Sequence, residues 1–161
     1  MSTHFIHALP GEWLSEIELQ HSVAEIEYVQ FWKMADLLAS DVIEKYSDYA
    51  DDEGAMVQSL FANIEEEADI FVSSSMPIRD IDTFLLSTNR SVQIFANRGA
   101  NGIEGVTSTA LGFSNGRKMR KTYLLIGDLA FLHDTNAFIA SRYQQCDLTV
   151  IVMNNDGGGI F

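Results

Sequence analysis

Two patterns of apolar residues divide the chain. Between residues 21 and 50 the apolar positions recur every three or four residues, which predicts one or two amphipathic helices, and a further helix is expected over about 54–65. From residue 69 onward, short β-rich runs alternate with helical patterns of about ten to fifteen residues. This alternation is typical of βαβ units, so an α/β fold with a parallel sheet is predicted behind a helical segment.

The α/β part is expected to consist of strands separated by helices. The predicted strands are 69–75, 92–97, 122–127 and 148–154, and the predicted helices are 78–87, 103–114 and 131–144. Parallel sheets bind ligands at the carboxyl ends of their strands, where helix N-termini present free N–H groups. The candidate sites are therefore the four turns "SSSMPIRD", "ANRGANGIEG", "IGDLAFLHD" and "MNNDGGGIF".

Charge is distributed unevenly along the 161 residues, whose net charge is −13. Residues 1–69 hold 16 of the 23 acidic residues against two lysines, whereas the remainder is nearly neutral. We interpret the acidic part as a solvated helical surface, and the balance argues against a nucleic-acid partner. The chemistry is therefore expected in the C-terminal part.

Other global features favour a cytoplasmic protein. The longest apolar runs are about six residues, far short of the roughly 20 that a membrane-spanning helix needs. The N-terminus lacks the cationic start and apolar stretch of a secretory signal. The single cysteine, Cys146, precedes an apolar strand and is expected to be inert.

The third and fourth turns predict a metal site. Asp128 follows one predicted strand, and Asn154 and Asn155 follow the next, so the two turns meet if these strands are neighbours. Carboxylate, amide and carbonyl oxygens suit Mg²⁺, which usually keeps substrate phosphates among its ligands. The alternatives are a helix cap for Asp128 and plain turn residues for Asn155 and Gly157.

A Gly-Asp pair followed by Asn-Asn resembles the thiamine-diphosphate motif. "GDLAFLHDTNAF", "NNDGGGIF" and "ANRGANGIEGVTSTALG" are similar to the forms found in the MenD family, the SEPHCHC synthases of menaquinone biosynthesis. The resemblance is close over residues 70–161 and vague before them. It implies a thiamine-diphosphate-binding α/β domain.

The resemblance also implies roles for individual residues. The metal, Mg²⁺ with Mn²⁺ as an alternative, would be bound by Asp128, Asn155 and the Gly157 carbonyl. The cofactor would also meet backbone around Gly127, Leu129, Ala130 and Gly158, helped by a helix beginning near Phe131, with Ile103 under its thiazolium ring. Substrate carboxylates would meet Ser75, Arg79 and Arg98. The glutamate that activates the cofactor has no counterpart in this chain, so no catalytic residue is assigned.

The implied activity is that of the family. Its members release CO₂ from 2-oxoglutarate and add the succinyl carbanion to isochorismate, in homodimers or homotetramers with shared active sites. The chain is expected to hold the end of an upstream domain or linker at 1–20, an acidic helical segment at 21–68 and an incomplete cofactor domain at 69–161, and to be inactive alone.

Three other interpretations remain open. Another thiamine-diphosphate 2-oxoacid decarboxylase or carboligase would share the same motif. A nicotinamide dinucleotide site is weaker, because the glycines at 99, 102 and 105 form GxxGxxG rather than GxGxxG. A noncatalytic α/β binding module would keep the fold without the chemistry. His133 and Asp134 resemble a catalytic pair, but adjacent helical residues point about 100° apart, which favours a structural role.

Overall fold

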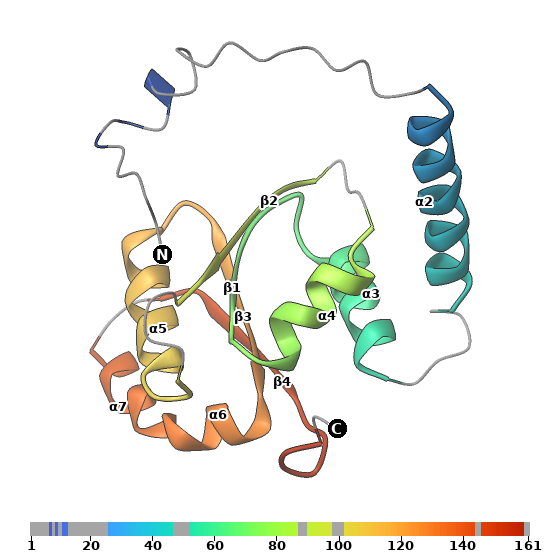
Figure 1. Ribbon diagram of the computed structural model, residues 1–161. Coiled ribbons are helices and arrows are strands. Elements are labelled where there is room, and N and C mark those ends of the chain that lie inside the picture. The colour runs from blue at the N-terminus through green and yellow to red at the C-terminus, as the bar shows by residue number, and fades with distance from the viewer. Residues whose placement is uncertain are drawn as a thin grey trace. The chain divides into compact units, whose positions relative to one another are not determined.

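The computed structural model describes residues 7, 9, 11–12, 26–46, 52–86, 90–97, 102–143 and 146–159 (Figure 1). The chain divides into two compact units, residues 1–38 and 39–161. Helix α2 (Ile26–Tyr46) is one continuous helix that crosses this division, and none of its residues is buried. In the described part of the chain, the helices are too short or too polar to span a bilayer.

The second unit is built on a four-stranded parallel sheet. Its strands are β1 (Glu67–Val72), β2 (Ser91–Ala96), β3 (Lys121–Gly127) and β4 (Leu148–Met153). They lie in the order β2-β1-β3-β4, and every neighbouring pair is parallel. The predicted α/β parallel-sheet fold is therefore confirmed. The strand order reverses direction between β1 and β3, and such a switch point is where open α/β sheets bind ligands.

Helices cover both faces of this sheet (Figure 1). Helices α3 (Glu53–Asn63) and α4 (Met76–Phe84) pack on one face, and α5 (Val106–Gly116) and α6 (Asp128–His133) pack on the other. Because side chains of a strand alternate between faces, both sets of alternate positions in β1 and β3 are buried. This accounts for their continuous apolar sequences, since strands covered on both sides need no polar face.

The two faces carry separate apolar cores. Ile70, Val72 and Leu125 point towards α3 and α4, whereas Leu124 and Ile126 point towards α5 and α6. Helix α3 also contributes Val57 and Phe61 to the first core, and Ile64, which directly follows the helix, packs there too. The predicted domain limits at residues 20 and 68 stay predictions, but α3 and the sheet share one core.

A buried ion pair network ties α5 and β3 to β1. Asp69 is fully buried, and its carboxylate accepts hydrogen bonds from Arg117 Nε at 2.7 Å and Arg120 Nε at 2.8 Å. The Arg117 guanidinium also lies 5.3 Å from the centre of the Phe95 ring, a cation–π geometry. The network lies where β3 begins, away from the carboxyl ends of the strands.

The helix predicted over 131–144 is wrong in its start and its continuity. Helix α6 begins at Asp128, directly after β3, and the segment continues as a short 3₁₀ turn, η1 (Thr135–Ala137), and α7 (Phe138–Ser141). The break falls at Asp134, whose backbone is not helical (φ −122°, ψ 27°). Its carboxylate instead accepts hydrogen bonds from Ser108 N (2.7 Å) and Ser108 Oγ (3.0 Å), in the first turn of α5. Asp134 thus has the structural role of capping α5 from outside the helix.

Candidate cofactor site

The ends of β3 and β4 bring the two halves of the predicted motif together. The strands pair in parallel, and Gly127 lies opposite Met153. The turns that follow them are therefore neighbours, and Asp128 Oδ2 accepts a hydrogen bond of 2.7 Å from Gly157 N. The prediction that these two strands are adjacent is confirmed. The Asp128 carboxylate therefore binds the backbone of the glycine turn, in addition to any capping of its own helix.

The glycine turn has a backbone that ordinary residues disfavour. Gly157 and Gly158 have φ of +86° and +81°, in the left-handed region where a Cβ is strained. Asn154 Oδ1 accepts a 3.1 Å hydrogen bond from Asp156 N, which closes the start of the turn. A Cβ on Gly157 would lie 3.7 Å from Leu129 Cδ2, so the Leu129 side chain packs over the turn. The sequence "NNDGGG" thus builds a compact turn beside Asp128.

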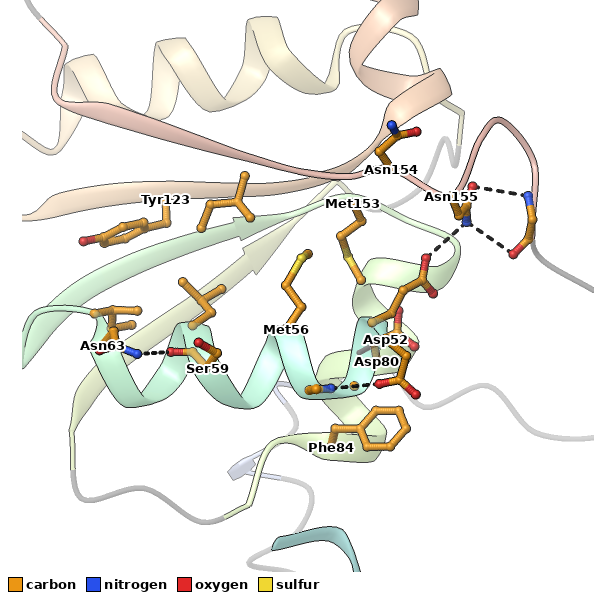
Figure 2. Close-up of a pocket in the computed structure, with 17 residues that line it drawn as sticks. Asp52, Met56, Ser59, Asn63, Asp80, Phe84, Tyr123, Met153, Asn154 and Asn155 are labelled. Carbon is orange, nitrogen blue, oxygen red and sulfur yellow. Dashed lines mark hydrogen bonds between the residues drawn. The ribbon is translucent and has the colours of Figure 1, made fainter. Parts of the chain in front are cut away.

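The Asn155 side chain reaches the start of α3 (Figure 2). Its Nδ2 donates to Glu53 Oε1 at 3.1 Å and to Gly159 O at 3.2 Å, and its Oδ1 accepts from Gly159 N at 3.2 Å. Gly159 fits because a Cβ there would lie 3.1 Å from the Asn155 carbonyl oxygen. Asn155 therefore links the turn to the start of α3.

The side-chain and backbone oxygens at this edge are of the chemical kind that Mg²⁺ binds. Among the described residues, no group of three or more His, Cys, Asp and Glu side chains is placed to hold a metal. A cation here would therefore depend on the Asp128 carboxylate together with amide and backbone oxygens. Mg²⁺ is commonly held by one or two carboxylates while phosphate oxygens and water complete its octahedron.

The backbone N–H groups predicted to meet the diphosphate lie in the first turn of α6. Leu129 and Ala130 follow Asp128 there, where N–H groups have no partner within the helix. Leu129 N donates to Asp128 Oδ1 at 2.7 Å. The expectation that this helix begins near Phe131 is corrected to Asp128. Since α6 has only six residues, individual N–H groups matter here more than a helix dipole.

Three other predicted site residues lie in the segments that follow β1 and β2 at the same edge. Ser75 and Arg79 are exposed at the start of α4, and β1, which precedes them, pairs with β3. Ser75 has a φ of +76°, an uncommon backbone for a serine. The Ile103 side chain is 41% exposed in the loop before α5. Arg98 lies outside the described residues.

Two acidic residues near the turn were missed by the sequence reasoning. Glu53 contacts Asn155 across 102 positions, and Asp80 of α4 lies close to the same end of α3 (Figure 2). Both line a pocket of about 1130 Å³ between α3, α4 and β4 that reaches Asn155 and Gly159 but not Asp128. The local sequence signal for this pocket was Asp80, an acidic residue on the apolar side of α4.

Asp80 is a buried carboxyl group with little compensation. Its side chain is 4% exposed, and Oδ2 has no hydrogen-bond partner. Burial, followed by the negative charge of Glu53 and a hydrogen bond with it, raises the pKa of Asp80 to about 6. Arg79 opposes this shift only weakly.

Comparison with known proteins identifies the family. Residues 83–161 match the family described as "Thiamine pyrophosphate enzyme, C-terminal TPP binding domain", and this match contains both halves of the motif. Over these residues the chain belongs to the thiamine-pyrophosphate-binding domain family. The match contains β2, β3 and β4, and thiamine diphosphate is the cofactor that it supports.

Three similar proteins carry the name 2-succinyl-5-enolpyruvyl-6-hydroxy-3-cyclohexene-1-carboxylate synthase. The protein of Lysinibacillus sphaericus (strain C3-41) is 61% identical over all 161 residues, which cover 28% of its length. That of Staphylococcus haemolyticus (strain JCSC1435) is 43% identical over 135 residues, 84% of this chain and 23% of the relative. That of Staphylococcus aureus (strain USA300) is 40% identical over 140 residues, 87% and 24% respectively. The resemblance to SEPHCHC synthases is confirmed, and the chain spans about a quarter of the length of these relatives.

The thiamine-pyrophosphate family match does not reach every site residue. It begins at residue 83, after Ser75 and Arg79 and after Glu53. The assignment of Ser75 and Arg79 to substrate stays a prediction.

Proposed function

We propose that this chain provides the cofactor-binding part of a SEPHCHC synthase. The enzyme would release CO₂ from 2-oxoglutarate and add the remaining succinyl unit to isochorismate, in menaquinone biosynthesis. The observation that carries the proposal is the 2.7 Å hydrogen bond from Gly157 N to Asp128 Oδ2, because it joins the two halves of the thiamine-diphosphate motif at one edge of the sheet. The names of the relatives support the choice of substrates.

The residues of this edge would hold Mg²⁺ and the diphosphate. Asp128, Asn155 and the Gly157 carbonyl supply oxygen ligands, with Mn²⁺ as an alternative metal. The backbone at Gly127, Leu129, Ala130 and Gly158 would surround the diphosphate. Thiamine diphosphate, when bound, supplies the electron sink that this decarboxylation and carbon–carbon bond formation require.

Substrate recognition would depend on positive charge around the same edge. Both substrates are polyanions, and Arg79 and Arg98 are guanidinium groups able to pair with carboxylates. The positive φ of Ser75 supports a binding role, because uncommon backbone conformations concentrate at functional sites. The half-exposed Ile103 presents an apolar surface of the kind that would support a thiazolium ring.

The assembly and location of the enzyme are part of the proposal. We propose a cytoplasmic homodimer or homotetramer with shared active sites. The net charge of −13 supports small-molecule substrates rather than nucleic acid as its partners.

Cofactor binding is tested by calorimetric titration of the full-length gene product with Mg²⁺ and thiamine diphosphate. We expect Asp128→Ala to abolish binding, because a diphosphate without its cation meets uncompensated negative charge. Asp147→Ala is the control: this exposed carboxylate pairs with Lys121 at 2.8 Å, at the opposite end of β3 and β4. Unchanged affinity in Asp128→Ala would refute the metal assignment. Binding of NAD would favour the nicotinamide dinucleotide site, and binding of neither cofactor would favour the noncatalytic binding module.

Substrate use is tested by CO₂ release from 2-oxoglutarate. We expect product formation to require isochorismate, thiamine diphosphate and a divalent metal together. Faster turnover of a different 2-oxoacid, or of a different acceptor, would identify another carboligase of the same family.

A further inference from the structure

Glu53 is the contact between α3 and the glycine turn. Its Oε1 accepts a 3.1 Å hydrogen bond from Asn155 Nδ2. A carboxylate only accepts hydrogen bonds, so it can face the NH₂ side of an amide and not the oxygen side. Together with Gly159, whose carbonyl faces the same NH₂ group and whose N–H faces Oδ1, Glu53 therefore fixes which way the Asn155 amide is turned.

The amide oxygen retains capacity for a metal in this orientation. Asn155 Oδ1 accepts one hydrogen bond, from Gly159 N at 3.2 Å. A carbonyl oxygen has two lone pairs, so the second is available to a cation. Gly159 O accepts from Asn155 Nδ2 at 3.2 Å, so Glu53 and Gly159 together occupy both amide hydrogens.

Glu53 is itself held in place by the start of α3. It is the first residue of α3, whose N-terminus is capped by Asp52 Oδ1 accepting from Ala55 N at 3.0 Å. Figure 2 shows Asp52 and Asp80 near this end of α3.

We propose that Glu53 is a positioning residue for the metal ligand Asn155: it orients the Asn155 amide so that Oδ1 is presented to the cation. This inference rests on the proposed function, in which Asn155 is a metal ligand. Partners of metal ligands outside the coordination shell commonly orient those ligands and strengthen metal binding.

The test is Mn²⁺ binding to the full-length gene product in the presence of thiamine diphosphate, followed by electron paramagnetic resonance. We expect Glu53→Ala to weaken Mn²⁺ binding about 10-fold or more, the usual cost of losing such a partner. Glu53→Gln can still accept the hydrogen bond through its amide oxygen and should retain affinity within about 3-fold. Thermal unfolding of each variant shows whether it is folded.

Asp52→Ala is the matched control, because it removes the cap of α3 without touching Asn155. If Glu53 acted only by stabilising α3, Asp52→Ala would weaken Mn²⁺ binding as much as Glu53→Ala, and the inference would be overturned. Equal losses in Glu53→Gln and Glu53→Ala would also overturn it, because charge rather than orientation would then matter.

Failure of the inference is distinct from failure of the proposed function. Mn²⁺ binding by the wild type, its loss in Asp128→Ala and full affinity in Glu53→Ala would overturn only the positioning role. A wild type that binds neither Mn²⁺ nor thiamine diphosphate would overturn both.

Discussion

Replacing Asp80 with asparagine is expected to stabilise the fold at neutral pH relative to the wild type. The Asp80 side chain is almost fully buried, and one of its oxygens has no hydrogen-bond partner. Glu53 and Asp52 add negative charge around it, and Arg79 offsets this only in part. Ionising a carboxyl group that is buried in this way is costly, whereas asparagine has nearly the same shape and carries no charge at neutral pH.

The size of the effect follows from the pKa of Asp80. It rises from 3.8 to about 6 on folding, and each pH unit corresponds to about 1.4 kcal/mol, so the cost of ionisation is about 3 kcal/mol. The pKa of Asp80 is higher in the folded state than in the unfolded state. The contribution of protonated Asp80 to the free energy of unfolding is therefore complete below about pH 3.8 and is lost as the pH rises through about 6. The wild type should therefore lose about 3 kcal/mol relative to Asp80→Asn over this interval.

Urea unfolding of the 161-residue chain, followed by far-ultraviolet circular dichroism at several pH values between about 4 and about 7, measures this difference. Asp82→Asn is the control, since Asp82 is exposed on the same helix. It should follow the wild type at every pH. Stability curves for Asp80→Asn and the wild type that stay parallel across this range would refute the reasoning.

Three further substitutions separate stability from function. Asp69→Ala leaves Arg117 and Arg120 without their buried carboxylate and should lower the free energy of unfolding by about 3–5 kcal/mol. Calorimetry should still show wild-type cofactor affinity per folded molecule. An unchanged free energy of unfolding in urea would contradict the stabilising role of this ion-pair network. Arg79→Ala should cost about 2 kcal/mol in kcat/KM with cofactor affinity unchanged, and normal steady-state kinetics would return Arg79 to an ordinary surface role. Asp134→Ala removes the cap on α5 and should cost about 1 kcal/mol, visible as faster amide exchange in the first turn of that helix; unchanged exchange would argue that solvent replaces the cap.

The cofactor edge was predictable because its main features are local in sequence. The alternation of β-rich and helical patterns predicted the order of strands and helices, and parallel strands place their following turns at one edge. Asp128 and the "NNDGGG" turn therefore met as expected, at a 2.7 Å hydrogen bond. The three glycines, two of them with positive φ, were also legible as a turn that side chains would strain.

Only the tertiary structure decided what surrounds that edge. A helical pattern predicted one helix over 131–144, but the helix breaks at Asp134. The Asp134 carboxylate instead accepts hydrogen bonds from the N-terminus of α5, whose N–H groups have no partner within their own helix. The contact of Glu53 with Asn155 joins positions 102 apart. No local pattern encodes it, because it depends on α3 and β4 packing at the same end of one core. The sequence by itself determined the order of strands and helices and the turn chemistry. Packing determined where the helix after β3 breaks and which distant side chains hold the Asn155 amide in its orientation.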